Sequence, residues 1–275
     1  MNIIHLNNVH VLDGPGPTLF YAHGFGCNQD MWDSITPAFL GQYKQVLFDY
    51  VGSGKSDSAA FDGQKYSSID AYVRDVTDVY DALGLDGNVI FVGHSVSCSI
   101  GVLAAVARPE LFKKLLLLGP NPHVLNEASG YQGGLEREDV VGLLELMDQN
   151  YIGWANFLAP LVSSQDASNE VTRKLSQSFC STDPVAARAF VQASFFADVR
   201  AELPKVSAPC LVLQHRHDAL APMSVGNYVN AHLPHSALKV LEVSGHCAHM
   251  SHPALVIEAL RDFIEAPQDS NQLLR

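Results

Sequence analysis

The stretch VIFVGHSVS, residues 89–97, decides the fold, because an apolar strand runs directly into a tight turn that carries Ser95. The apolar residues 100–107 that follow are typical of a helix. A serine at such an elbow stands at the carboxyl edge of a sheet, next to the free amides of a helix amino end. The usual pattern is G-x-S-x-G, and Ser97 replaces its last glycine. Many unrelated chains contain this pattern, so the rest of the sequence must support it.

Two polar residues follow later strands. The strand predicted over residues 211–214 is followed by Asp218, and the strand predicted over residues 238–243 is followed by His246. Nucleophile, acid and histidine therefore occur in the chain order of α/β-hydrolases, each in a loop after a strand. We expect His246 to take the proton of Ser95 and Asp218 to orient His246.

An oxyanion hole is expected at the same edge. The strand predicted over residues 18–22 ends in HGFG, residues 23–26, where such a hole receives its second amide. The backbone amides of Phe25 and Val96 should hold the oxyanion while Ser95 attacks an ester or lactone carbonyl. Water activated by His246 then releases the acyl group, so no cofactor is expected.

The spacing of apolar runs predicts the domain organisation. Short strands alternate with amphipathic helices up to residue 119, as a parallel sheet requires. Four helical patterns without strands follow, at residues 136–150, 152–161, 170–179 and 184–196. We predict an α/β-hydrolase fold with a mostly parallel central sheet and a four-helix lid inserted over its carboxyl edge. The predicted parts are a core of residues 1–120 and 198–267, a lid of residues 121–197 and a C-terminal tail of residues 268–275.

Composition excludes several classes of function. The chain has 275 residues, 47% of them hydrophobic, and a formal charge of −12, which argues against nucleic acid and anionic membranes as partners. It has no apolar run of membrane-spanning length and no signal-peptide pattern at its start. Five scattered cysteines are an odd number without metal-type spacing, which is typical of a reduced protein. We expect a cytoplasmic location.

Aromatic residues of the lid predict an apolar substrate pocket. Their other interpretation is that they pack the lid helices on one another, but a small lid has little interior, so some should face the serine. No pair of basic residues is evident that would bind a carboxylate or phosphate. A small, uncharged, hydrophobic ligand is therefore expected. The predicted pocket residues are Phe25, His94, Tyr131, Trp154, Leu158, Phe179, Phe195 and Ala219.

Two other motifs are given no function. Residues 52–56, GSGKS, resemble a phosphate loop, but Asp49 stands where that motif needs a glycine. His246, His249 and His252 recur every third residue, without the spacing of known zinc motifs or a thiolate pair. No metal is expected.

Several longer motifs resemble the RsbQ-type α/β-hydrolases. They are GFGCNQ at residues 24–29, LFDYVGSG at 47–54, GHSV at 93–96, YQGG at 131–134, NYIGW at 150–154, FCSTDP at 179–184 and GHC at 245–247. The family includes the bacterial stress regulator RsbQ, which works beside a PAS-domain phosphatase, and the plant strigolactone and karrikin receptors. Ser97 is similar to the plant branch, whereas the surroundings of Cys180 and Cys247 are closer to the bacterial one. Leu158 stands where the plant receptors carry a pocket phenylalanine, so their ligand does not transfer directly.

The resemblance implies a Ser-His-Asp hydrolase with an apolar pocket and a signalling role. Three classes of function stay open. The first is a hydrolase of small hydrophobic esters or lactones, with butenolides among the candidates, linked to stress signalling. The second is a ligand-sensing module whose slow hydrolysis serves a partner such as a PAS-domain phosphatase. The third is a lyase or cofactor-free peroxidase that uses the same triad.

Overall fold

A computed structural model describes residues 2–266 and shows a seven-stranded sheet in the order β1-β3-β2-β4-β5-β6-β7. All neighbouring strands are parallel except β1 and β3, which are antiparallel. The strands are β1 (His10–Leu12), β2 (Gly16–Ala22), β3 (Tyr43–Leu47), β4 (Val89–His94), β5 (Lys114–Leu118), β6 (Cys210–His217) and β7 (Ser236–Ser244).

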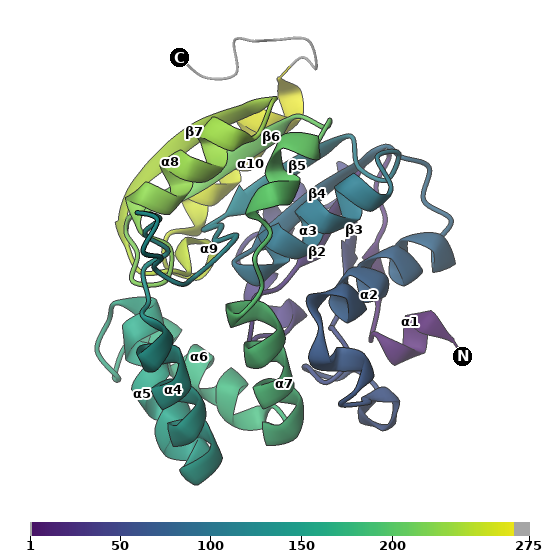
Figure 1. Cartoon of the computed structure of the whole chain (residues 1–275). Helices are drawn as coiled ribbons and strands as arrows, with labels where there is room; N and C mark the ends of the chain where they lie inside the picture. Colours follow the sequence, from purple (N-terminus) through teal and green to yellow (C-terminus); the bar gives the residue numbers. More distant parts are fainter. Residues whose placement is uncertain (1, 267–275) are drawn as a thin grey trace.

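Helices cover both faces of this sheet (Figure 1). Alternate residues of β2 enter two different apolar clusters, Phe20 and Ala22 one, Leu19 and Tyr21 the other, because successive side chains of a strand point to opposite faces. The helices of the sheet layers are α1 (Ile3–Leu6), α2 (Ile69–Ala82), α3 (Val96–Ala107), α8 (Met223–His232), α9 (Ala248–Ser251) and α10 (Pro253–Glu265).

Four helices between β5 and β6 form the lid, which gathers at one end of the sheet in Figure 1. They are α4 (Arg137–Gln149), α5 (Tyr151–Ser163), α6 (Glu170–Ser181) and α7 (Pro184–Phe195). Their starts follow from capping: the side chains of Asn150, Asn169 and Asp183 accept backbone amides of α5, α6 and α7. The predicted fold class is confirmed.

Two elements are absent from the sequence-based prediction, α1 and β1. They have four and three residues, too few to show a period. The exact bounds of core and lid stay a prediction, and the predicted tail of residues 268–275 lies outside the described residues. Within residues 2–266 no helix has the length and apolar character needed to cross a membrane.

Candidate active site

Ser95 stands at the elbow between β4 and α3. Its backbone has φ 58° and ψ −122°, a strained conformation for a residue with a side chain. The turn is tight enough that a Cβ on Gly93 would lie 2.9 Å from the carbonyl oxygen of Ser97. The elbow therefore requires glycine at position 93 and holds Ser95 at the amino end of α3.

Ser97 has a role that glycine could not have. Its hydroxyl donates to the carbonyl of His23 at 2.5 Å, and the hydroxyl of Tyr50 donates to Ser97 Oγ at 2.8 Å. These bonds tie the loop after β2 to the first turn of α3. In that loop a Cβ on Gly24 would lie 2.6 Å from Nδ1 of His94 and 3.3 Å from the Cβ of Ser95, so glycine permits the loop to approach the elbow closely.

The predicted oxyanion donors meet at one cavity. Phe25 and Val96 both line the cavity that Ser95 lines. Among the described residues, neither backbone amide donates a hydrogen bond to another group, and Val96 is the first residue of α3. Two residues with free backbone amides thus line the cavity beside the serine, and an oxyanion hole requires such amides.

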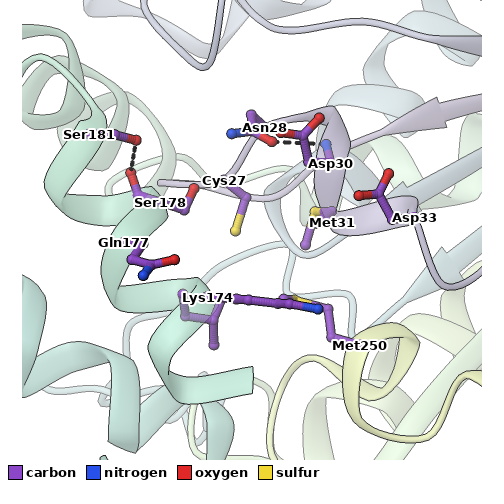
Figure 2. A pocket seen from close by; sticks show the side chains of 11 residues that line it. Cys27, Asn28, Asp30, Met31, Asp33, Lys174, Gln177, Ser178, Ser181 and Met250 are labelled. Carbon is purple, nitrogen blue, oxygen red and sulfur yellow. Dashed lines mark hydrogen bonds between the residues drawn. The ribbon is translucent and has the colours of Figure 1, made fainter. Parts of the chain in front are cut away.

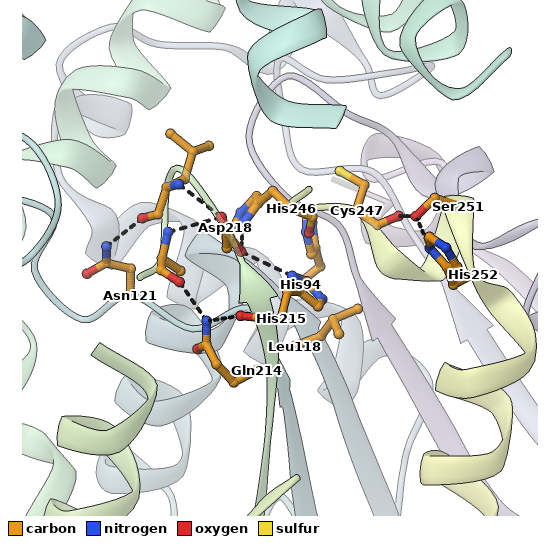
Figure 3. Close-up of polar contacts among 12 residues, drawn as sticks. His94, Leu118, Asn121, Gln214, His215, Asp218, His246, Cys247, Ser251 and His252 are labelled. Carbon is orange, nitrogen blue, oxygen red and sulfur yellow. Dashed lines mark hydrogen bonds and ion pairs between the residues drawn. The ribbon is translucent and has the colours of Figure 1, made fainter. Parts of the chain in front are cut away.

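Asp218 follows β6 and contacts His246 in the loop after β7 (Figure 3). His246 Nδ1 lies 2.7 Å from Asp218 Oδ2, while Oδ1 accepts the amides of Leu220 and Ala221 at 2.9 and 3.1 Å. Burial alone would raise the pKa of Asp218, but its electrostatic interaction with His246 and the hydrogen bonds from two imidazoles outweigh this and hold the pKa of Asp218 well below its usual range. Asp218 is therefore ionised.

The contact with Asp218 determines which nitrogen of His246 donates. An ionised carboxylate only accepts hydrogen bonds, so in the neutral form of His246 the proton is on Nδ1 and Nε2 offers its lone pair. Nε2 is buried and has no hydrogen-bond partner among the described residues, so its bond to Ser95 is not formed in this state. Catalytic hydrogen bonds often tighten only when substrate binds.

The lid holds the backbone of His246. The amide of His246 donates to the carbonyl of Val162 in α5 at 2.7 Å. Gly245, with φ 95°, precedes it, and a Cβ there would lie 2.3 Å from the carbonyl oxygen of Ser163. Only glycine allows the end of α5 to approach this loop so closely.

His215 is a site residue that the sequence did not reveal. Its Nδ1 lies 3.0 Å from Asp218 Oδ2, the oxygen that also contacts His246. The signal was the spacing of three residues between His215 and Asp218, but spacing alone does not show that the two side chains meet.

The cavity beside Ser95 has a volume of about 30 Å³. Two of the predicted pocket residues, Phe25 and Phe195, line it. The remaining lining residues were not predicted: Ser99, Asn121, Val124, Leu135, Ser194 and Leu220. Asn121 and Leu220 could have been found, because they follow the carboxyl ends of β5, which neighbours the elbow strand β4, and of β6, which neighbours β5.

The other predicted pocket residues lie elsewhere. Trp154 and Phe179, each 2% exposed, pack behind Phe25 with ring centroids 5.9 and 6.3 Å from its own, and Leu158 is buried in the same apolar cluster. They do not line this cavity, because their side chains fill the space between the lid helices and the core. Their role in a substrate pocket stays a prediction.

Three further residues that were predicted for the pocket do not line the cavity beside Ser95. Tyr131 packs against Tyr228 and under Arg200, away from the cavity wall. Ala219 is exposed, and Leu220 lines the cavity in its place. His94 is buried, and its Nε2 donates to the carbonyl of His246 at 2.9 Å, so it supports the histidine loop from behind.

A second cavity, of about 360 Å³, lies between α6 and the loop after Phe25 (Figure 2). Cys27, Met31, Leu175 and Met250 line it, and Asp30, Asp33 and Lys174 are also on its wall. It shares no lining residue with the cavity beside Ser95. Burial raises the pKa of Cys27 to about 12, so its thiol is not activated.

Potential metal donors are already engaged or protonated. The donor atoms of His94, Cys247 and His249 lie within 4.8 Å of one another, but burial raises the pKa of Cys247 well above its usual value. A protonated thiol and an imidazole bound to a carbonyl do not suit a metal ion. A second such group includes Glu127 and Asp198, whose carboxylates both bind Arg200. That the site needs no metal stays a prediction.

Comparison with known proteins identifies the family of the chain. Residues 19–259 match the model of the alpha/beta hydrolase family. The chain is 36% identical to strigolactone esterase D14 of Arabidopsis thaliana, over 94% of this chain and 97% of that one. It is also 36% identical to karrikin insensitive 2 receptor CA of Petunia hybrida, over 92% and 94% of the two chains. A hydrolase structure from Oleispira antarctica is similar with a TM-score of 0.93 and 40% identity, covering 97% of each chain.

Proposed function

The chain belongs to the α/β-hydrolase family, and from this premise we propose that it hydrolyses small, uncharged, hydrophobic esters or lactones by acyl transfer through Ser95, His246 and Asp218. The observation that carries the proposal is the 2.7 Å contact between His246 Nδ1 and the ionised Asp218. It leaves His246 Nε2 unprotonated for Ser95, whose strained elbow lies on a cavity with two free amides.

The steps follow from these positions. Ser95 Oγ attacks the carbonyl carbon as its proton moves to His246 Nε2, and Asp218 stabilises the imidazolium. The amides of Phe25 and Val96 hold the oxyanion, and removal of one such donor typically costs about 10²–10³ in rate. The proton then passes to the leaving oxygen, and a water molecule deprotonated by His246 hydrolyses the acyl-Ser95.

The lining of the cavity supports a small, uncharged substrate. Phe25, Val124, Leu135 and Phe195 are apolar, and no lysine or arginine lines it. A charged acyl group would lose its hydration there without a partner. Five-membered lactones and short acyl esters fit this chemistry, and the names of the relatives, a strigolactone esterase and a karrikin receptor, are compatible with it.

A signalling role of the RsbQ type is the second candidate. It is supported by the receptor named among the 36%-identical relatives and by the motifs shared with RsbQ-type hydrolases. In that role the chain senses a small ligand and acts on a PAS-domain phosphatase in the cytoplasm. All five cysteines, which lie in the described part of the chain, are unpaired, as expected in a reducing compartment.

Turnover of 4-nitrophenyl acetate tests the enzymatic proposal. Ser95→Ala and His246→Ala should each lower kcat by at least ~10³, because triad members act as a unit. Ser181→Ala, on the exposed part of α6, is the matched control and should keep the wild-type rate. A wild-type rate in Ser95→Ala would refute the proposal. Gel filtration of the chain with a PAS-domain phosphatase from the same genome, with and without a bound butenolide, tests the signalling role, which the lack of a complex in both states would contradict.

A further inference from the structure

One oxygen of the Asp218 carboxylate accepts hydrogen bonds from two histidines. Asp218 Oδ2 lies 2.7 Å from Nδ1 of His246 and 3.0 Å from Nδ1 of His215, and the two rings are nearly perpendicular at 87° (Figure 3). The triad chemistry needs only the first of these contacts. The second comes from a side chain of β6 that is fully buried.

The charge of Asp218 fixes the tautomer of His215. An ionised carboxylate offers no proton, so both Nδ1 atoms must donate to Oδ2. Burial lowers the pKa of His215 despite its contact with Asp218, so its ring is neutral. His215 therefore donates one hydrogen bond to Asp218 and adds no charge to the site.

Packing alone does not explain why position 215 is a histidine. Nε2 of His215 is buried and has no hydrogen-bond partner among the described residues. An unpaired buried nitrogen is unfavourable, and an apolar side chain of similar size would avoid it. What the imidazole contributes at this place is its bond to Asp218.

We propose that His215 is a positioning residue of the triad: its Nδ1–H holds the carboxylate of Asp218 and limits how strongly Asp218 attracts the proton of His246. The inference rests on the proposed hydrolase function. With two donors on Oδ2 and two backbone amides on Oδ1, the carboxylate is fixed on all sides. Without His215 more of its charge acts on His246, so the imidazolium becomes a weaker acid.

Other titratable groups near this pair must be separated from the effect. They are His94 on β4, Cys247 in the loop after His246, His249 on α9 and the exposed His252. Burial lowers the pKa values of His94 and His249 well below the usual value, and burial raises the pKa of Cys247. These three are therefore neutral near neutral pH. His252 is the group that needs a control variant.

The test compares two substitutions at position 215. His215→Leu removes the donor, whereas His215→Asn places an amide N–H close to the position of Nδ1. We expect the acidic limb of the pH profile of kcat/KM to move to higher pH by on the order of one unit in His215→Leu. It should stay at the wild-type position in His215→Asn and in the control His252→Gln. His215→Leu should melt no lower than wild type.

The outcomes decide between positioning and packing. A limb that stays in place in His215→Leu, with or without a lower melting temperature, would overturn the proposal. So would an equal shift in His215→Leu and His215→Asn, or an equal shift in His252→Gln.

A readout without turnover separates this proposal from the hydrolase function. In Ser95→Ala protein, the downfield proton resonance of His246 Nδ1–H should shift in the added His215→Leu variant and not in His215→Asn. Turnover that survives in Ser95→Ala would refute the hydrolase proposal, whereas an unchanged resonance in both double variants would refute only the role of His215.

Discussion

Trp154 and Phe195 allow the lid core and the substrate pocket to be distinguished. Trp154 is 2% exposed, and its ring lies 5.4, 5.7 and 5.9 Å from those of Tyr151, Phe179 and Phe25. Replacing a buried tryptophan by alanine costs about 3–5 kcal/mol, part of it from such aromatic pairs. We predict that Trp154→Ala lowers the free energy of unfolding by this amount.

Replacing Phe195 by alanine should cost less stability than replacing Trp154. It is partly exposed, lines the cavity beside Ser95 and has one aromatic neighbour, Phe25, at 6.3 Å. Phe195→Ala should therefore cost only about 1–2 kcal/mol of stability, a part of the value for full burial. It enlarges the cavity, and each added methylene of an acyl chain should gain about tenfold or more in relative kcat/KM.

Urea unfolding gives the stabilities, and kcat/KM for 4-nitrophenyl acetate, butyrate and hexanoate gives the acyl preference. Trp154→Phe is the control for Trp154→Ala, because it keeps a ring in place and should lose less stability than the alanine variant. Equal destabilisation of the two alanine variants with unchanged acyl preference would show that Phe195 also belongs to the lid core.

Three further predictions concern the elbow, pH and metals. Ser97→Ala removes both hydrogen bonds of the hydroxyl and should cost about 1–3 kcal/mol and lower kcat, so a wild-type kcat would show that Ser97 does not place the loop of Phe25. Burial raises the pKa of Asp75 to about 6, so the folded chain holds a proton that the unfolded chain releases above about pH 4. Stability should fall by about 3 kcal/mol as pH rises from about 4 to about 6 in wild type and not in Asp75→Asn, and parallel urea curves for the two would contradict this. Dialysis against a strong chelator should leave the turnover of 4-nitrophenyl acetate unchanged, and a loss that zinc restores would show a metal site.

The strands and the order of the triad could be predicted because they depend on local patterns. An apolar run followed by a polar loop residue identifies the carboxyl end of a strand, and parallel strands bring such ends together. The structure accordingly places Asp218 beside His246, although they are 28 residues apart in sequence. The short elements α1 and β1 lack a pattern long enough to be recognised.

The pocket could be predicted only in part, because the direction of a side chain depends on packing. Trp154 and Phe179 lie on lid helices, where aromatic residues can face either the substrate or a neighbouring helix, and both face other rings. The contact of His215 with Asp218 depends on how the chain turns at the end of β6, which no residue type signals. Tertiary contacts decide these positions, and local sequence does not.

Labelling with a fluorophosphonate tests the central claim most directly, because this reagent reacts with a serine that a neighbouring base activates. Peptide mapping by mass spectrometry should find the adduct on Ser95 in wild type, with little adduct in His246→Ala. An unlabelled Ser95 in active wild-type protein, or equal labelling of Ser95 with and without His246, would contradict the account.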